Sequence, residues 1–237
     1  MKTIAIVDAD SCIYQAAWQQ NSIESALENY KHLISKNWID PCWADENIVY
    51  CGNTNRDNFR YKLCPDYKSN RKSLPHDARL FKPLMEKIAE VELAIPAVGM
   101  EADDLVRIKA EELRSVEDVV TTIVHIDKDL DCIAGMHYNP RHKDFYSVDE
   151  DQADFHYWSQ ILKGDPTDNL PGLPRVGEKT AKKMLNGVPM DRRKSKVYAA
   201  YRAKYGRSEW EKKLLETANG IHILRHEEDF FEIGSVR

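Results

Sequence analysis

The chain has 237 residues, of which 42% are hydrophobic and 31% charged, and its formal net charge is −5. This length is enough for one large domain, or for one domain with a smaller appendage. No stretch approaches the roughly 20 apolar residues of a membrane span, and the N-terminus leads into an apparent strand without a signal peptide. We therefore expect no membrane association and a cytoplasmic protein, in the host cytoplasm if the chain is viral.

Cysteine and histidine spacing argues against a thiolate or histidine metal site. The five cysteines are odd in number, dispersed and without a C-x-x-C pair, which predicts reduced thiols, no disulfide and no zinc site. His222 and His226 are four residues apart, and we expect them to form a solvated pair.

Strand and helix signals alternate over the first part of the chain. In chain order the pattern predicts a strand at 3–7, helices at 11–20 and 24–39, a strand at 47–51, a polar loop or marginal helix at 65–83, helices at 78–93 and 101–114, and a strand at 119–124. Such alternation is typical of parallel βαβ units with right-handed crossovers. After about residue 149 the strand signals fade, so we expect an α/β core at 1–148 and a helical part at 149–237.

Acidic residues stand where the apolar runs end. Asp8 follows the run at 3–7, Asp127 and Asp129 follow the run at 119–124, and the segment 101–104 reads Glu-Ala-Asp-Asp. The carboxyl ends of parallel strands line one crevice where ligands bind, so these acids are expected to meet there. Clustered carboxylates repel one another unless cations lie between them. Hard oxygen ligands suit Mg²⁺ or Mn²⁺, and the pattern predicts a metal-dependent phosphodiesterase.

Each acidic segment also has a structural explanation. Asp8 and Asp10 precede a helix, and for either residue alone an N-cap explains the acid at least as well as a metal role does. The acids of 101–104 lie in a first helical turn, where the helix dipole favours them. Three acids in four residues nevertheless exceed what capping requires. The acidic run at 127–131 is compatible with a surface turn, although its place after a strand favours a site.

The negative net charge hides two basic segments. Residues 60–82 contain seven basic and two acidic residues, a net charge of +5, and residues 175–213 contain thirteen basic and four acidic residues, a net charge of +9. A solvated helix face explains a single charge run. Two basic segments flanking an acidic cluster are better explained by a polyanion that lies across a metal centre.

The segment 161–181 carries the strongest local signal. A helix ends near Lys163, a loop bounded by glycines contains Asp165 and Asp168, and a second helix opens after Gly177. Its basic face carries Lys179, Lys182 and Lys183. Backbone N–H groups at such a helix start form a phosphate clamp that does not read sequence.

Together these motifs resemble the 5′→3′ exonuclease and flap endonuclease family, which includes the nuclease domain of bacterial DNA polymerase I and exonucleases of tailed bacteriophages. The resemblance spans nearly the whole chain and implies a PIN-like α/β core followed by a helix-three-turn-helix at about 160–187. It implies two Mg²⁺ or Mn²⁺ ions, with this ligand set: Asp8, Glu101, Asp103, Asp104, Asp127, Asp129, Asp165 and Asp168.

The segment 65–71 resembles the family's Y-K-x-x-R motif. The resemblance implies that Tyr67 stacks on or orients DNA and that Lys68 and Arg71 hold the reacting phosphate as catalytic residues. The complete DNA-binding set that we expect is Tyr67, Lys68, Arg71, Lys72, Arg175, Gly177, Lys179, Thr180, Lys182 and Lys183. A K⁺ ion at the hairpin of the helix-three-turn-helix is implied more weakly.

The implied mechanism is two-metal hydrolysis of a phosphodiester. One ion lowers the pKa of a bound water that attacks phosphorus, and the other stabilises the leaving 3′ oxygen, so that the product carries a 5′ phosphate. Expected partners are DNA with a 5′ end, nick, gap or flap, then RNA/DNA hybrids, and replication proteins. The direction of cleavage rests on the resemblance.

Three departures from the family pattern qualify this expectation. Asn53, Thr54 and Asn55 stand where the family has an aspartate after the second strand. The metal contact of that aspartate is then made by an amide, made by Asp57, or lost. His125 and Ile126 replace small residues before the D-x-D motif. The stretch 67–80 is too short for a long helical arch, so exonuclease action is favoured over threading of flaps. A non-catalytic DNA clamp and a PIN-type ribonuclease are the alternatives.

Overall fold

The computed structural model of the chain describes residues 1–55 and 57–234. They form two compact units: the first comprises Met1–Asn58, Ser73–Val148 and Leu224–Glu227, and the second Phe59–Lys72, Asp149–Ile223 and Glu228–Arg237. The segment Phe59–Lys72, which lies within the predicted 1–148 core, thus packs with the second unit.

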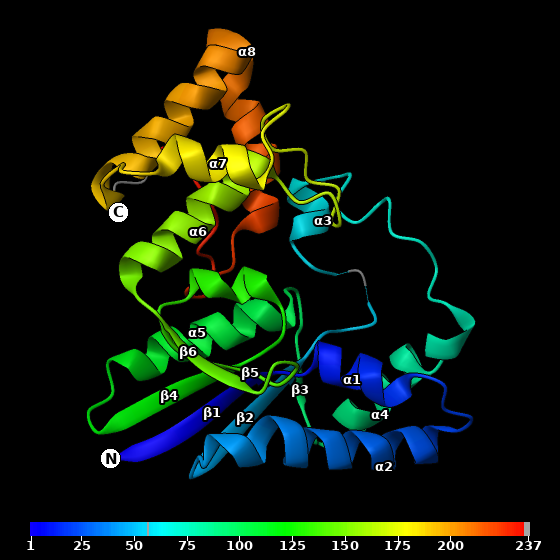
Figure 1. The fold of residues 1–237 in the computed structure, drawn as a ribbon. Coiled ribbons are helices and arrows are strands. Elements are labelled where there is room, and N and C mark those ends of the chain that lie inside the picture. The colour runs from blue at the N-terminus through cyan, green and yellow to red at the C-terminus, as the bar shows by residue number, and fades with distance from the viewer. Residues whose placement is uncertain (56, 235–237) are drawn as a thin grey trace. The chain divides into compact units, whose positions relative to one another are not determined.

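The first unit is built on a six-stranded sheet (Figure 1). Its strands are β1 (Lys2–Asp8), β2 (Glu46–Cys51), β3 (Ile95–Pro96), β4 (Val119–Val124), β5 (Gly135–Asn139) and β6 (Asp144–Val148), in the order β3-β2-β1-β4-β5-β6. All neighbouring pairs are parallel except β5 with β6, which is antiparallel. This arrangement confirms the predicted α/β class with a mostly parallel sheet.

Helices cover the sheet. They are α1 (Asp10–Ala17), α2 (Ile23–Leu33), α4 (Phe81–Glu90) and α5 (Ala102–Arg114), with the short 3₁₀ segments η2 (Asp40–Cys42), η3 (His76–Ala78) and η4 (Lys128–Cys132). Successive side chains of a strand point to opposite faces. Ala5 and Val7 of β1 accordingly share a core with Ile13 of α1, Tyr30 of α2 and Leu84 of α4, while α5 packs against β1, β2 and β4.

Two predicted helices have different bounds. The helix expected at 24–39 ends as an α-helix at Leu33 and continues as the π-helical segment η1 (Ile34–Ile39), where Trp38 becomes buried. The helix expected at 78–93 is preceded by η3 and begins only at Phe81. Pro83 is tolerated there because the N–H groups of a first helical turn have no intrahelical partner.

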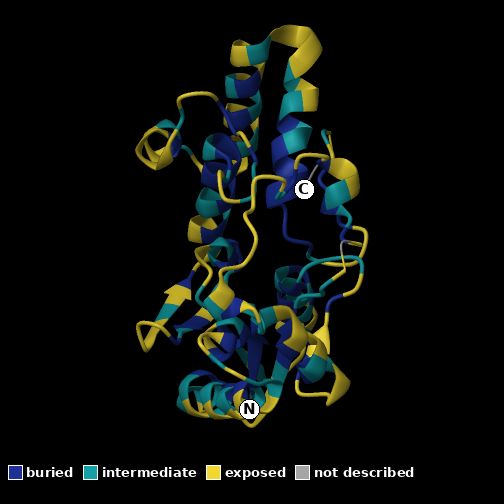
Figure 2. Cartoon of the chain, turned by 90° about the vertical axis from the view of Figure 1, so that its right-hand side faces the viewer, coloured by how far each residue is buried: buried dark blue, intermediate teal, exposed yellow. Residues whose placement is uncertain are grey.

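The second unit is helical. It contains α3 (Arg60–Leu63), α6 (Glu150–Lys163), α7 (Glu178–Leu185) and α8 (Met190–Ile221), and α8 is kinked at Gly206. Figure 2 shows α8 exposed near this kink and buried towards its C-terminal end. The buried guanidinium of Arg60 donates to the carbonyls of Gly220 at 3.1 Å and His222 at 2.7 Å, so it ties α3 to the end of α8.

The expectation of a solvated histidine pair is wrong for His222. Its side chain is 1% exposed, with Nδ1 3.1 Å from the Tyr157 hydroxyl and Nε2 3.0 Å from the Asp229 carboxylate. His226 is exposed, as expected. The tail after α8 folds back on α6, and this packing buries one histidine and leaves the other outside.

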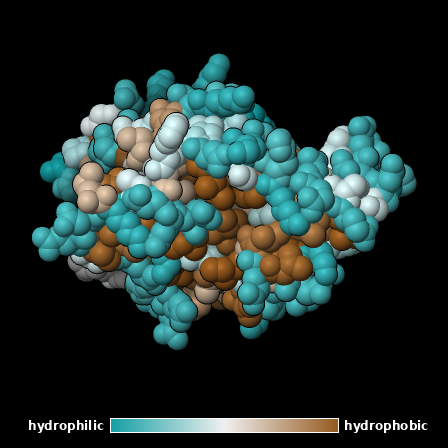
Figure 3. Space-filling model, turned by 90° about the horizontal axis from the view of Figure 1, so that it is seen from below, coloured by the Kyte–Doolittle hydropathy of each residue, from teal (hydrophilic) through white to brown (hydrophobic). Residues whose placement is uncertain are grey.

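The face drawn in Figure 3 has hydrophilic side chains around its margin and apolar side chains gathered near its middle. Among the described residues, Trp43, Met1 and Val98 are the most exposed large hydrophobic residues. All five cysteines are free thiols. Within residues 1–55 and 57–234, no helix is both long and apolar enough to cross a membrane.

Candidate metal centre and nucleic-acid interface

The carboxyl end of β1 is the switch point of the sheet, because β1 pairs with β2 on one side and with β4 on the other. Ligands of open α/β sheets bind at such points. Asp8 is the last residue of β1 and lies opposite Tyr50 of β2, and the pairing is extended by a hydrogen bond from Ala9 N–H to the Tyr50 carbonyl. The strand register thus places Asp8 at the switch point of the sheet.

Asp8 is a strongly perturbed carboxyl group. Its side chain is 8% exposed, and burial raises its pKa well above the ordinary value. The charge of Asp10 raises this pKa further, and the charges of Asp127 and Glu101 add to the effect. The structure therefore gathers acids from three separate segments of the chain into one repelling group, which a cation would stabilise.

Asp10 is a member of this group that sequence reasoning assigned to capping. The N-cap of α1 is Ala9, which has no side-chain cap, and Asp10 lies in the first helical turn. Its Oδ1 accepts a hydrogen bond of 2.6 Å from the backbone N–H of Gly52, directly after β2. The spacing Asp-x-Asp at 8–10 was the available sequence signal, but pairing with Gly52 depends on the β1–β2 register.

The Glu-Ala-Asp-Asp segment opens α5 and divides its acids between two roles. Glu101 and Asp104 form a capping box, in which Asp104 Oδ2 accepts from the Glu101 N–H at 2.9 Å. Asp104 is fully buried, and its Oδ1 accepts from the Leu224 N–H at 2.9 Å. Glu101 and Asp103 are half-buried. Asp104 is thus engaged by backbone donors at both oxygens, whereas the other two acids retain more exposure.

The loop after β4 carries the D-x-D motif. Asp127 caps η4 through its Oδ1, which accepts from the Asp129 N–H at 2.9 Å. Asp127 is exposed and Asp129 is half-buried. After β2, the side-chain oxygen of Asn53 accepts from the Asn55 N–H at 2.9 Å, while Asp57 is exposed. Asn53 therefore uses its oxygen in a local turn, and the carboxylate beside the end of β2 belongs to Asp10.

These residues fit a hard divalent cation. The donors around Asp8 are carboxylate oxygens, and the pKa of Asp8 is raised first by burial and then by the charges of these neighbours. Within the described parts of the chain, no three of these carboxylates have oxygens all within 4.8 Å of one another. Carboxylate oxygens are the protein ligands that hard divalent cations take.

In the second unit, Asp165 and Asp168 lie in a tight hairpin between α6 and α7. Asp165 and Leu170 form an antiparallel bridge, and Asp165 Oδ1 accepts from the Thr167 N–H at 2.8 Å. Gly164 has φ +71°, and a Cβ at this position would lie 2.3 Å from the Leu170 carbonyl oxygen. The hairpin thus requires glycine at 164 and presents both aspartates from one turn.

The three residues of the predicted Y-K-x-x-R motif gather around Asp168. Arg71 donates to Asp168 Oδ1 through Nε at 3.1 Å and through a shorter contact from its terminal nitrogen. The Tyr67 hydroxyl donates to Oδ2 at 3.1 Å, and Lys68 Nζ lies 3.7 Å from the same oxygen. Tyr67 is 3% exposed in this structure, and its hydroxyl helps to orient the charged pair. That Tyr67 stacks on or orients DNA stays a prediction.

The remaining predicted DNA-binding residues lie on exposed surface of the same unit. Lys72, Arg175, Gly177, Lys179, Thr180, Lys182 and Lys183 are all exposed. Gly177 is the N-cap of α7 and has open space where a Cβ would be. Glu178 accepts from Lys163 at 2.8 Å and pairs with Lys182 at 3.0 Å, which joins the end of α6 to the start of α7. A basic helix start with an open backbone is suited to binding phosphate.

Sequence reasoning also missed a buried cluster behind the D-x-D loop. His125, noted only as a departure from the family pattern, is 1% exposed, and its Nε2 lies 2.7 Å from Nδ1 of His137. Asp131 completes the group. The segment 135–148, for which no element was predicted, forms the β5–β6 hairpin that brings His137 beside His125.

Comparison with known proteins agrees with this geometry. Residues 3–156 match the model of the family described as 5′-3′ exonuclease, N-terminal resolvase-like domain. A 5′-3′ exonuclease of Buchnera aphidicola from Schizaphis graminum is 26% identical over 197 residues, which cover 76% of this chain and 68% of that protein. Another from Acyrthosiphon pisum is 30% identical, covering 69% of this chain and 57% of that protein.

Two further similarities agree. DNA polymerase I of Pseudomonas aeruginosa is 34% identical over 55% of this chain, which corresponds to 15% of the polymerase. A solved structure of the bacteriophage T5 5′-exonuclease with bound zinc has a TM-score of 0.64 at 16% identity, covering 93% of this chain and 86% of the phage protein. That similarity shows a shared fold. Because the family model matches more than half of its residues, the chain belongs to the 5′-3′ exonuclease family.

Proposed function

We propose that the chain is a divalent-metal-dependent 5′→3′ exonuclease that hydrolyses DNA to 5′-phosphate products, with flap endonuclease action as a second activity. The observation that carries this proposal is the buried Asp8 carboxyl at the sheet's switch point, whose pKa is raised by burial and then by the charges of Asp10, Asp127 and Glu101. A group of acids held together against its own repulsion is expected where a cation is bound.

The metal ligands that we propose in the first unit are Asp8, Asp10, Glu101, Asp103, Asp127 and Asp129. Asp104 would support them by fixing the start of α5, because both of its oxygens accept backbone hydrogen bonds. Asp165 and Asp168 remain proposed ligands from the second unit. Bound Mg²⁺ or Mn²⁺ would supply an activated water and stabilise the charge of the leaving oxygen.

In the second unit, Lys68 and Arg71 would neutralise the reacting phosphate. Asp168 holds both side chains in place, so their positive charges are oriented before DNA binds. Preoriented charges of this kind stabilise a transition state without reorganising during the reaction. The exposed lysines of α7 and the N–H groups after Gly177 would bind the DNA backbone, with an affinity that falls steeply with salt.

The test is cleavage of 5′-labelled DNA with and without divalent metal. Blunt, nicked, gapped and flapped duplexes, single strands, RNA and RNA/DNA hybrids would be incubated with Mg²⁺, Mn²⁺ or EDTA. We expect metal-dependent release of 5′-phosphorylated products from DNA. Asp127→Asn should abolish cleavage and retain DNA binding, while Glu28→Gln, on the exposed surface of α2, should retain both. Absence of metal-dependent DNA cleavage by the unmodified protein would contradict the proposal.

Finer parts of the proposal have their own measurements. RNA/DNA hybrids are proposed as secondary substrates, and the substrate panel measures their rate relative to DNA. A K⁺ ion at the hairpin of residues 164–177 would strengthen DNA binding in KCl compared with NaCl at equal ionic strength. Replication proteins are the proposed partners, and a DNA-independent complex with a polymerase or single-strand binding protein would support them.

A further inference from the structure

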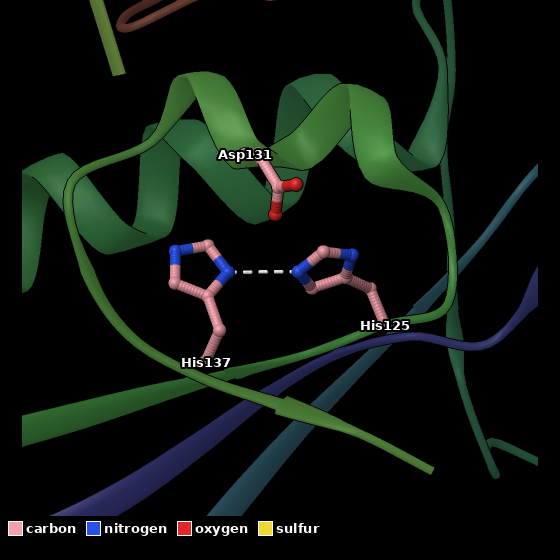
Figure 4. Close-up of side chains that lie close together, drawn as sticks. All are labelled: His125, Asp131 and His137. Atoms are coloured by element: carbon pink, nitrogen blue, oxygen red, sulfur yellow. Dashed lines mark hydrogen bonds between the residues drawn. The ribbon is translucent and has the colours of Figure 1, made fainter. Parts of the chain in front are cut away.

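Two buried histidines, His125 and His137, and the half-buried Asp131 lie together beside the proposed DNA-cleavage site and have no role in it. His125 follows β4, Asp131 is in η4, and His137 is in β5 (Figure 4). One ligand atom from each residue lies within 4.8 Å of the others. Both histidines are almost completely buried, at 1% and 0% exposure.

Backbone carbonyls determine which ring nitrogens carry protons. His125 Nδ1 lies 2.5 Å from the Asp127 carbonyl oxygen, and His137 Nε2 lies 2.8 Å from the Ile133 carbonyl oxygen. A carbonyl has no proton to donate, so both of these nitrogens must be N–H donors. In neutral imidazoles, the two remaining nitrogens then carry lone pairs.

Those two remaining nitrogens face each other. His125 Nε2 and His137 Nδ1 are 2.7 Å apart, a contact that requires a positive centre between them. Two neutral imidazoles carry two N–H protons, and the two carbonyl contacts use both of them. No proton is left for the contact between the two rings. The Tyr146 hydroxyl is 3.3 Å from His125 Nε2, but it gives its single proton to Asp131 Oδ1 at 2.7 Å. The protein atoms around the pair therefore do not complete the hydrogen bonding.

A third proton would place an imidazolium between two buried rings, which desolvation opposes. The Asp131 carboxylate is the group that would balance the charge of such an imidazolium. A metal ion also supplies a positive centre between the two nitrogens, and it does so without a third proton because the lone pairs of neutral imidazoles are its ligands. Histidines that bind metals usually donate their other N–H to a carbonyl or carboxylate, as both rings do here.

We propose that His125 Nε2, His137 Nδ1 and the Asp131 carboxylate bind a Zn²⁺ ion at a site separate from the proposed Mg²⁺ site. Two nitrogens and one carboxylate oxygen favour zinc or a similar transition metal over Mg²⁺. Zinc–nitrogen distances of about 2.0–2.1 Å in a tetrahedral site require about 3.3 Å between the nitrogens, so the rings separate slightly on binding. A water or the Tyr146 hydroxyl completes the coordination.

The proposed zinc site has a structural role. Its ligands flank and include the loop that carries Asp127 and Asp129, and they connect the end of β4 with η4 and β5. His125 also contacts the backbone of Asp127 directly. A bound ion would hold this loop in the conformation that presents both aspartates.

The test is metal binding to the chain of 237 residues in saturating Mg²⁺, which occupies the oxygen-rich site. Protein freed of transition metals and kept in saturating Mg²⁺ would be titrated with Zn²⁺, followed by thermal unfolding. A second titration uses Co²⁺, whose visible spectrum distinguishes a four-coordinate nitrogen site from six oxygen ligands. We expect one equivalent of either ion, intense Co²⁺ bands and a higher melting temperature with Zn²⁺.

The variants separate this site from its surroundings. Asp131→Asn and His137→Gln should lower the Zn²⁺ affinity by more than the roughly 10–100-fold cost of losing an outer-shell partner, and should remove the Co²⁺ bands. If His137→Gln does not fold, the less buried Asp131→Asn decides. His142→Gln, an exposed histidine in the β5–β6 turn, should bind as the unmodified protein does.

A Co²⁺ spectrum of oxygen ligands alone, or Zn²⁺ binding that Asp131→Asn leaves unchanged, would overturn the proposal. A shared proton between the two histidines would then explain their contact. Because DNA cleavage in Mg²⁺ is measured separately, this outcome leaves the proposed nuclease activity untouched.

Discussion

The carboxylate of Asp10 occupies the space that a side chain at position 52 would need. A Cβ on Gly52 would lie 2.7 Å from Asp10 Oδ2 and 3.3 Å from Oδ1, and the Gly52 N–H donates to Oδ1. The family pattern has an aspartate after the second strand, and this chain lacks one there. We propose that Asp10 supplies from α1 the carboxylate that is missing after β2.

This relationship predicts that a carboxylate at position 52 can partly replace the one at position 10. Asp10→Ala should weaken Mn²⁺ binding about tenfold or more, or about 1.4 kcal/mol, because it removes one carboxylate from the site. Adding Gly52→Asp should restore part of the affinity, since Gly52 does not have the positive φ that disfavours other residues. Calorimetric titration with Mn²⁺ measures both. Full affinity in the single variant would show that Asp10 only orders the backbone at Gly52.

The repulsion around Asp8 predicts that removing its charge raises the stability of the metal-free protein and weakens metal binding. Asp8→Asn removes a buried charge whose ionisation is opposed by burial and by three neighbouring acids. The metal-free protein should melt roughly 2–4 °C higher, the shift that about 1 kcal/mol causes in a chain of this size. Stabilisation by added Mg²⁺ should disappear. Thermal unfolding with EDTA and with Mg²⁺ measures both effects, and a lower melting temperature in EDTA would contradict the prediction.

The ion pairs of Asp168 predict a specific loss of catalysis. Arg71→Ala removes a guanidinium that Asp168 holds through two contacts and that would neutralise the phosphate. We expect kcat/KM to fall about 100-fold or more, the usual cost of removing one oriented charge donor. Arg79→Ala, an exposed arginine outside this group, is the matched control. Equal losses in both variants would indicate a general effect of positive charge.

The hairpin between α6 and α7 predicts different outcomes at two glycines with the same backbone conformation. Gly164 and Gly187 both have φ +71°, but a Cβ at 164 would meet backbone atoms at 2.3 and 2.5 Å, while a Cβ at 187 meets nothing within 4 Å. Gly187→Ala should cost about 1–2 kcal/mol from the left-handed conformation alone. Gly164→Ala should cost clearly more because the hairpin must move. Urea unfolding of both variants isolates the steric part.

Glu178 predicts a dependence of stability on acid pH. Hydrogen bonds from Lys163 and then Lys182 lower the pKa of Glu178 to about 2. The lowered pKa means that its stabilising effect is full above the unfolded-state value of about 4.3 and is lost as pH falls towards 2. Because the side chain is half exposed, we expect less than about 1 kcal/mol. In Glu178→Gln, the unfolding free energy should fall less between pH 5 and pH 2.5.

Much of the first unit follows from local patterns. The apolar runs before Asp8 and Asp127 became parallel neighbours β1 and β4, as their lengths and acidic ends indicated. The Glu-Ala-Asp-Asp segment opens a helix, yet its last acid is engaged by Leu224, 120 residues further along the chain. Local sequence could identify a capping box there, but not the distant N–H that completes it.

The histidines illustrate the opposite limit. His222 and His226 are only four residues apart, yet His222 is buried between Tyr157 and Asp229 and His226 is exposed. His125 and His137 are twelve residues apart and meet only because β5 pairs with β4. Burial and pairing of this kind depend on tertiary contacts that no periodicity encodes.

By itself, the sequence determined the parallel α/β class, the acids at strand ends and the glycine-bounded hairpin, because strand length, side-chain chemistry and glycine conformation are local properties. Only the tertiary structure decided which acids interact with Asp8 and that Asp10 accepts a hydrogen bond from Gly52. It also decided that Tyr67, Lys68 and Arg71 all contact Asp168. The hydrogen bonds among these join residues 42 to 101 positions apart. They arise from strand register and unit packing, which bring distant side chains within bonding distance.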